Sequence, residues 1–209
     1  MQPAITVAVI AATVSAIGWV VNYILSLKSE RKRSHLAARL SHVERQLELL
    51  YGPLVFLVYE GRRSFLDLLD KLGRSYVFRN DEELQPDDLE LWLFWVDHEF
   101  IPRNIAIKNL LSSRTHLVFG NKLPSSYIRF LDHHNSWHIE HQLWKERQVP
   151  YVWHSKINWP REFEDDVISA FEQLMKEHAT LIGIIGGSEL RSRTRTFLRR
   201  LRRTSTPGL

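Results

Sequence analysis

The chain has 209 residues, a formal net charge of +4 and no cysteine. The length leaves room for one domain with a real core beside a membrane helix, and the lack of cysteine excludes disulfides, thiolate nucleophiles, Cys-type zinc fingers and iron–sulfur clusters. Residues 28–33 carry +3, residues 189–203 carry +6, and residues 34–188 between them carry −5. A mildly acidic body with basic ends fits contact with anionic lipid headgroups, whereas nucleic acid is a disfavoured partner.

An uncharged stretch opens the chain and runs from Ala4 to Leu27. As a helix it would reach roughly 36 Å, enough for a hydrocarbon core of about 30 Å. Trp19 and Tyr23 suit the membrane interface, and the basic cluster that follows indicates a cytoplasmic side. We predict a transmembrane anchor over residues 1–27 of a single-pass membrane protein, with its N-terminus outside. The alternative is a cleaved signal peptide, for which the stretch is too long and its basic flank on the wrong side.

Small residues recur every fourth position in this stretch, at Ala4, Ala8, Ala12 and Ala16. Such a stripe lets a second helix approach closely, and it would support self-association as a homodimer in the membrane. Alanine is also common in apolar helices by chance, which is the alternative.

The next segment has a coiled-coil spacing. Apolar residues alternate in steps of four and three at Leu36, Leu40, Val43, Leu47, Leu50, Leu54 and Leu57. This seam is typical of a coiled coil or of a long bundle helix. Pro53 interrupts it, so we expect a kink or a break near Tyr51. The seam is short for a free coiled coil, which favours packing within one chain over pairing of two.

The remaining elements predict an all-α bundle over residues 28–188. Pro86 with Asp87 and Asp88 is typical of a helix start, and the apolar residues 89–100 that follow predict a central buried helix. Three further helices are expected at about 102–116, 124–147 and 160–182, each opening on a proline. No alternating strand pattern competes with them.

Two short segments carry a resemblance to known proteins. At ERQLELLYGPL, residues 44–54, and at Trp159-Pro160, the chain resembles a group of small bacterial proteins of unknown function with one N-terminal span and a helical body. The resemblance extends over most of the length. It implies this architecture and a bacterial inner-membrane setting. Its motifs are packing motifs, so it implies no catalytic residues.

Residues 132–141 are the best candidate for chemistry. On a helix, His134 and His138, or His138 and His141, lie close enough to hold one metal ion, but His134 and His141 are roughly 10.5 Å apart along the axis. Further ligands must come from another helix, and residues 97–99 are the natural suppliers. The candidate set for a transition metal is therefore His134, His138, His141, Asp97, His98 and Glu99.

The same histidines also fit a packing face, because they belong to a stripe with spacing 4,3,4,3. Its members are Phe130, His134, Trp137, His141 and Trp144. No Glu-x-x-His, His-Glu-x-x-His, phosphate-binding loop or Gly-x-Ser-x-Gly motif occurs in the chain. We therefore expect no cofactor and favour a structural role for these histidines, with metal binding as the alternative.

The C-terminal residues 189–209 predict a basic amphipathic tail. Leu190, Thr194, Phe197, Leu198 and Leu201 share one helix face, and arginines occupy most of the rest. Gly186 and Gly187 predict a hinge that would make this tail a separate helix. The expected lipid or partner contacts are Arg191, Arg195, Phe197, Arg199 and Arg202. The alternatives are a tail that closes the bundle or stays in solvent.

Taken in order, the anchor, the heptad seam and the lack of catalytic motifs favour a non-enzymatic, membrane-anchored adaptor or scaffold with a protein partner. A membrane-tethered metal-binding protein or enzyme that uses residues 133–141 is the alternative. Elemental analysis of the purified protein would distinguish the two.

Overall fold

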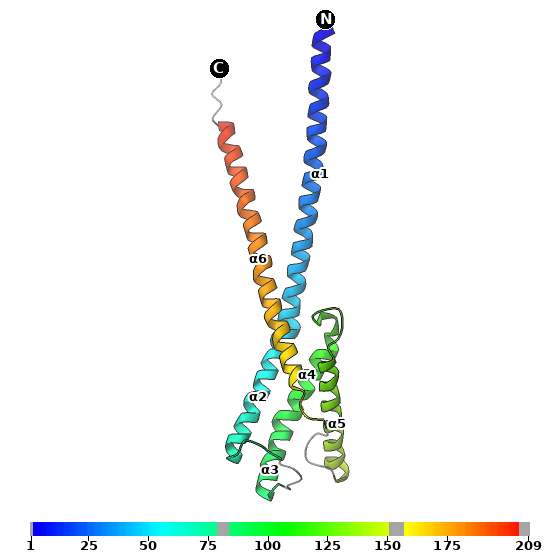
Figure 1. The fold of residues 1–209 in the computed structure, drawn as a ribbon, viewed down its shortest axis with the longest axis vertical. Coiled ribbons are helices and arrows are strands. Elements are labelled where there is room, and N and C mark those ends of the chain that lie inside the picture. Colours follow the sequence, from blue (N-terminus) through cyan, green and yellow to red (C-terminus); the bar gives the residue numbers. More distant parts are fainter. Residues whose placement is uncertain (1, 79–83, 151–156, 205–209) are drawn as a thin grey trace. The chain divides into compact units, whose positions relative to one another are not determined.

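The computed structural model describes the backbone of residues 2–78, 84–150 and 157–204, and side chains within residues 13–187 of those ranges. Every regular element in these ranges is helical, which confirms the all-α prediction. In chain order they are α1 (Gln2–Gln46), η1 (Leu47–Tyr51), α2 (Gly52–Leu72), α3 (Pro86–Trp95), η2 (Val96–Phe100), α4 (Ile101–Ser113), η3 (Thr115–Leu117), α5 (Ser125–Arg147) and α6 (Arg161–Thr204) (Figure 1).

The chain divides into two compact units. One holds residues 1–43 and 177–209, and the other holds residues 44–176. In the first unit, Arg39 of α1 and Glu177 of α6 form a bidentate ion pair with N···O distances of 2.5 and 2.7 Å. This geometry is the strong form of the Arg–carboxylate pair. The pair joins α1 to α6 within this unit.

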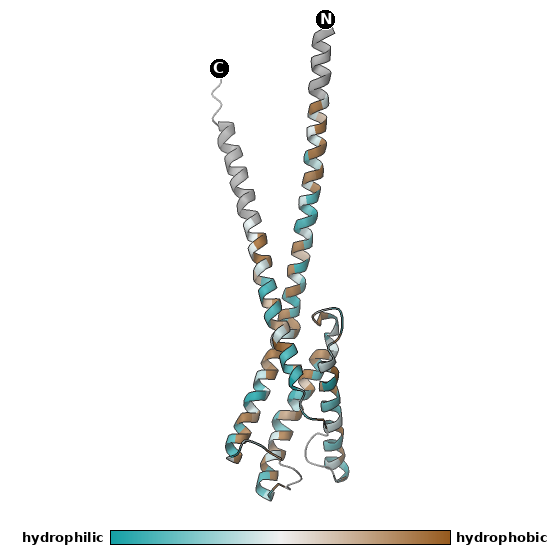
Figure 2. Cartoon of the chain, viewed as in Figure 1, coloured by the Kyte–Doolittle hydropathy of each residue, from teal (hydrophilic) through white to brown (hydrophobic). Residues whose placement is uncertain are grey.

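In the described residues, no helix is both long and apolar enough to cross a membrane. The side chains of residues 4–12, the first part of the uncharged stretch, lie outside the described side chains. The described part of that stretch, residues 13–27, belongs to α1 and is hydrophobic and exposed (Figure 2).

The helix continues through the proline at position 53, so the break expected as one of two outcomes near Tyr51 does not occur. Residues 47–51 form a π-turn in which the backbone N–H of Gly52 donates to the carbonyl of Leu47, and α2 follows directly. Proline has no backbone N–H, so in an α-helix it leaves one carbonyl of the preceding turn without a donor. The π-turn accommodates this loss because its hydrogen bonds join residues five positions apart instead of four. A Cβ at Gly52 would lie 2.8 Å from the Leu47 carbonyl oxygen, so this turn requires glycine.

The same arrangement recurs in the next helical segment. Residues 96–100 form a second π-turn, in which the N–H of Ile101 donates to the carbonyl of Val96, and Pro102 follows. The predicted helix from about Pro102 is present as α4, with the proline in its first turn, but it follows the π-turn without a break. The proline lies inside one continuous helical segment from Pro86 to Ser113, and the π-turn absorbs it.

The segment 89–100 is buried on one face only, which corrects the prediction of a central buried helix. Its buried side chains are Trp92, Val96 and Phe100, whereas Phe94 is exposed. The buried face forms a core together with residues of α2, α4, α5 and the loop after α2. The members of this core are Leu68, Val77, Trp92, Val96, Phe100, Ile101 and Trp137. The helix therefore packs as an amphipathic element despite its apolar composition.

A second cluster joins α5 to the first turns of α6. Phe130 stacks on Phe163 with ring centroids 4.7 Å apart, and Tyr127 and Trp159 meet Phe163 edge to face. α5 begins at Ser125 after Pro124, and α6 begins at Arg161 after Pro160, so both predicted helix starts are confirmed. Within residues 44–176, α2, the segment α3 to α4, α5 and the start of α6 form the helical bundle (Figure 1).

α6 continues well beyond the predicted end at residue 182. Its backbone is helical from Arg161 to Thr204, through Gly186 and Gly187, so the predicted hinge and the separate tail helix are wrong. Glycine is only about 1 kcal/mol less favourable than alanine inside a helix, a cost that the long helix on both sides of the pair can absorb. Two helical glycines in such a context do not stop the helix.

Candidate functional site at the second π-turn

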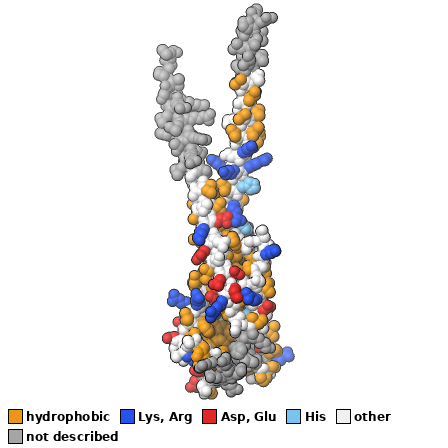
Figure 3. Space-filling view, viewed as in Figure 1, with side chains coloured by type: hydrophobic (Ala, Val, Ile, Leu, Met, Phe, Trp, Pro, Cys, Tyr) orange, Lys and Arg blue, Asp and Glu red, His pale blue; other side chains and the backbone are white. Residues whose placement is uncertain are grey.

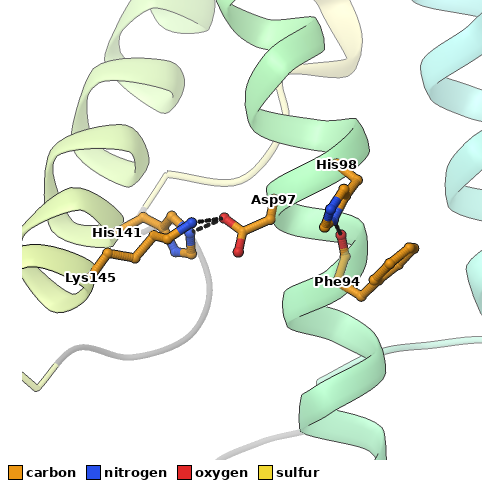
Figure 4. Close-up of polar contacts among 5 residues, drawn as sticks. All are labelled: Phe94, Asp97, His98, His141 and Lys145. Carbon is orange, nitrogen blue, oxygen red and sulfur yellow. Dashed lines mark hydrogen bonds and ion pairs between the residues drawn. The ribbon is translucent and has the colours of Figure 1, made fainter.

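The second π-turn and α5 meet at a polar cluster that we call the Asp97 cluster, made of Asp97, His141 and Lys145 (Figure 4). The Nε2 atom of His141 donates to Oδ1 of Asp97 over 2.7 Å, and Nζ of Lys145 donates to the same oxygen over 2.9 Å. His141 and Lys145 are one helical turn apart on α5, so both reach the same carboxylate. Asp97 reaches them from the π-turn.

Charge and burial differ across the Asp97 cluster. Burial would raise the pKa of Asp97, but the hydrogen bonds from His141 and Lys145 outweigh it and hold this pKa below its usual range. Lys145 is half exposed, whereas the side chain of His141 is only 1% exposed. The carboxylate is therefore ionised at neutral pH and satisfies a buried imidazole from one side and a solvated ammonium from the other.

Of the six predicted metal ligands, Asp97 and His141 meet across two helices, and His134 and His138 stack on one another within α5 with ring centroids 5.3 Å apart. His98 is exposed, and its Nδ1 donates to the carbonyl of Phe94, 2.9 Å away on the same helix, while its ring stacks on Phe94 (Figure 4). Glu99 lines a different cavity. Within the described side chains, no three histidine or acidic residues gather as a metal site would require.

The remaining histidines of α5 lie on the packing face that their spacing indicates. His134 is buried and stacks between Phe130 and His138. Burial lowers the pKa of His134 to about 4, and the nearby Lys108, His138 and His133 act in the same direction. His133, also buried, donates from Nδ1 to the carbonyl of Ile157 over 2.5 Å. These neutral rings serve as aromatic packing with a polar edge.

An aspartate bound to a histidine supplies two of the three members of a catalytic triad, because it can orient an imidazole that acts as a base. Here the imidazole is buried and bonds through Nε2 to the carboxylate, which leaves no open approach for a substrate. The carboxylate also holds Lys145. The Asp97 cluster therefore cross-links η2 to α5, a structural role that agrees with the packing interpretation of the stripe.

The other predicted sites fall mostly outside the described side chains. Ala4, Ala8 and Ala12 belong to this group, whereas Ala16 is exposed on α1. The predicted lipid or partner contacts Arg191, Arg195, Phe197, Arg199 and Arg202 also lie outside it, on a helical backbone. Their roles stay predictions.

Sequence reasoning missed two cavities, and each lies beside one of the π-turns. One, of about 300 Å³, lies between α2 and the segment α3 to η2 and is lined by Glu60, Arg63, Ser64, Asp67, Phe94, Trp95 and Glu99. The other, of about 150 Å³, lies beside Tyr51 at the end of the first π-turn. The lining residues of each cavity come from helices that are far apart in the sequence, so no pattern within one helix indicated either cavity. π-turns are frequent at functional sites.

No protein-family model, no curated protein and no solved structure matches this chain.

Proposed function

We propose that this chain is a non-enzymatic adaptor, anchored in the inner membrane by residues 4–27, whose helical body binds a protein partner in the cytoplasm. The observation that carries the proposal is an apolar face on α2 that the body leaves open. Phe56, Tyr59 and Leu66 are 68%, 48% and 55% exposed. Their positions at i, i+3 and i+10 put them on one side of the helix, opposite the buried Leu54 and Leu68.

Aromatic side chains that a monomer leaves in water are typical of a surface that another protein covers. Arg63 is also exposed and lies on the same face, four residues after Tyr59 and three before Leu66, with Arg62 and Asp67 exposed beside it. Aromatic residues and arginine are both enriched at protein interfaces. A catalytic function has less support, because the polar groups of the Asp97 cluster, the best candidate site, hydrogen-bond to one another.

The membrane anchor is supported by the uncharged run of residues 4–27 and the basic cluster after it. On the described part of α1, hydrophobic side chains give way to Lys and Arg side chains along the helix (Figure 3). Deletion of residues 1–27 is expected to move the protein from the membrane fraction to the soluble fraction. A reporter that works only in the cytoplasm, fused after Leu209, is expected to be active, and an inactive reporter would contradict the orientation.

The partner surface can be tested with a photo-crosslinking amino acid in the cell. Placed at Tyr59, it is expected to give one discrete adduct of higher mass. Placed at Glu172, an exposed position of α6 in the same unit, it is expected to give none. Equal labelling at the two positions, or no adduct at Tyr59, would contradict the proposed interface.

A metal-binding role is the alternative, and it rests on the contact of Asp97 with His141 between two helices. Two ligands are fewer than a structural or a catalytic metal site takes from a protein, and Lys145 occupies the same carboxylate oxygen. The adaptor is therefore the better supported of the two.

A further inference from the structure

The cavity beside the first π-turn, which we call the Tyr51 cavity, has a buried floor and an exposed mouth. Tyr51, Tyr127 and Ala170 form the floor, and each of the two tyrosines is 1% exposed. Asp166, Ser169 and Gln173, which follow one face of α6, form the mouth, and the walls are Phe119 and Pro124. Its volume of about 150 Å³ equals that of an engineered cavity that binds benzene in another protein.

The hydrogen bonds on the floor leave one donor without an acceptor. The hydroxyls of Tyr51 and Tyr127 are 3.4 Å apart, and the backbone N–H of Phe119 donates to the Tyr51 oxygen over 2.8 Å. Two hydroxyl groups supply two hydrogens, and only one of them can lie between the two oxygens. The other hydrogen has no acceptor among the contacts of these two residues. A buried donor of this kind requires a partner, and the cavity is the space that both tyrosines line.

The mouth offers a hydrogen-bond acceptor, whereas the floor offers a donor. Asp166 accepts from the hydroxyl of Ser126 over 2.5 Å, and a carboxylate has further lone pairs to offer a donor in the cavity. Burial, together with Tyr51 and Asp166, raises the pKa of Tyr127 far above its usual range, so the floor stays protonated and donates. An occupant must therefore accept from the tyrosines and donate to the carboxylate.

This requirement selects among ligand classes. An anion would face the carboxylate of Asp166, and among the described side chains no lysine, arginine or histidine lines the Tyr51 cavity to offset it. An ammonium group carries donors but no acceptor for the tyrosine hydrogen. A hydroxyl group both accepts and donates, and two neighbouring hydroxyls can serve the floor and the mouth together. The rings of Tyr51, Tyr127 and Phe119 supply apolar wall for a carbon ring.

We propose that the Tyr51 cavity binds a small neutral ring compound with neighbouring hydroxyl groups, with one hydroxyl on the Tyr51–Tyr127 pair and one on Asp166. The site lies apart from the exposed face of α2 and does not depend on the adaptor function. It also does not involve the Asp97 cluster, which belongs to the second π-turn.

The test uses the full chain and a matched pair of probes, cis-1,2-cyclohexanediol and cyclohexanol. Saturation-transfer NMR and thermal unfolding measure binding to the protein. The diol is expected to bind about tenfold more tightly than the mono-alcohol, because only the diol can pair with both ends of the cavity. If neither probe binds, water alone occupies the cavity, and if both bind equally, the second hydroxyl contributes nothing; either result overturns the proposal.

Two variants locate the binding. Ser169→Trp places a large side chain at the exposed mouth and is expected to abolish binding of the diol, whereas Glu172→Trp, one turn further along α6 and outside the cavity lining, is expected to leave it unchanged. The double variant Tyr51→Phe and Tyr127→Phe keeps both rings and removes both donors, so the diol should lose its advantage over cyclohexanol. If the double variant does not fold, the comparison of Ser169→Trp with Glu172→Trp still tests where the diol binds. Diol binding unaffected by Ser169→Trp would overturn the proposal.

Discussion

His141 donates a hydrogen bond of 2.7 Å to Asp97 from a position 44 residues away in the sequence. Lys145, one turn further along α5, shares the same carboxylate oxygen. This contact is the one place where the predicted candidate residues of two different helices meet. It connects the second π-turn to α5, and the single carboxylate of Asp97 accepts hydrogen bonds from two donors.

Removal of the Asp97 carboxylate should therefore destabilise the body. Asp97→Ala leaves the buried His141 without its acceptor, and we expect a loss of about 1–3 kcal/mol in the free energy of unfolding, measured by urea denaturation. The matched control is His98→Ala, one residue along. His98 is exposed and bonds only to the carbonyl of Phe94, so its change should stay within about 0.5 kcal/mol. Equal effects would show that the cross-link contributes nothing.

The buried histidine His134 predicts a loss of stability in mild acid. Its pKa is about 4 in the folded protein, against 6.5 for the free side chain. Between pH 4 and pH 6.5 the His134 side chain is protonated in the unfolded chain but not in the folded chain. The free energy of unfolding therefore falls as the pH drops from 6.5 towards 4. The loss should approach about 3 kcal/mol. His134→Gln should flatten this slope, and His98→Gln at an exposed position should keep it, as unfolding at several pH values will show.

Periodicity predicted the fold class and the starts of the helices at Pro86, Ser125 and Arg161, because prolines and apolar spacing act locally. It also predicted the packing face of α5, where His134 and His141 are buried between aromatic residues. It did not predict that Pro53 and Pro102 would each be absorbed by a π-turn. That outcome depends on the packing of Tyr51 and Phe100 in the core, which stabilises a continuous helix over a broken one.

The candidate site was predicted only in part, for a similar reason. A spacing of three or four residues places His134, His138 and His141 near one another on α5, but their partners come from tertiary packing. Asp97 was among the suppliers considered, whereas Lys145 was not, although it lies one turn beyond His141. The Tyr51 cavity joins residues separated by more than a hundred positions, and no pattern within one helix indicates it.

The heptad seam should act within one chain. Leu50 and Leu54 are fully buried inside the body, so Leu50→Ala should cost about 2–5 kcal/mol of unfolding free energy through the cavity it creates. Leu66→Ala on the exposed side of α2 should change it by about 0.5 kcal/mol or less. If the seam instead paired two chains, Leu50→Ala would dissociate a dimer and leave the monomer's stability unchanged, as sedimentation analysis would detect.

Two glycines should respond to alanine with opposite signs. At Gly52 the new methyl group would meet the Leu47 carbonyl oxygen at 2.8 Å, so Gly52→Ala should lower the melting temperature by straining the first π-turn. At Gly183, in the exposed part of α6, the methyl group meets nothing within 4 Å, and alanine should stabilise the helix by about 0.5–1 kcal/mol. A stabilised Gly52→Ala protein would mean that the π-turn is dispensable.

The C-terminal arginines predict binding to anionic lipid, and a synthetic peptide of residues 187–209 isolates their effect. The tail carries seven arginines against one glutamate up to residue 203, on a backbone that is helical to Thr204. Each arginine near an anionic surface contributes about 1 kcal/mol, so replacement of Arg191, Arg195, Arg199 and Arg202 by glutamine should weaken binding to vesicles with anionic headgroups by about a thousandfold at low salt. The native peptide should bind neutral vesicles weakly and lose its anionic preference as salt rises. Salt-independent binding, or equal binding by the glutamine peptide, would contradict the lipid interpretation and leave the arginines as a surface for an acidic partner.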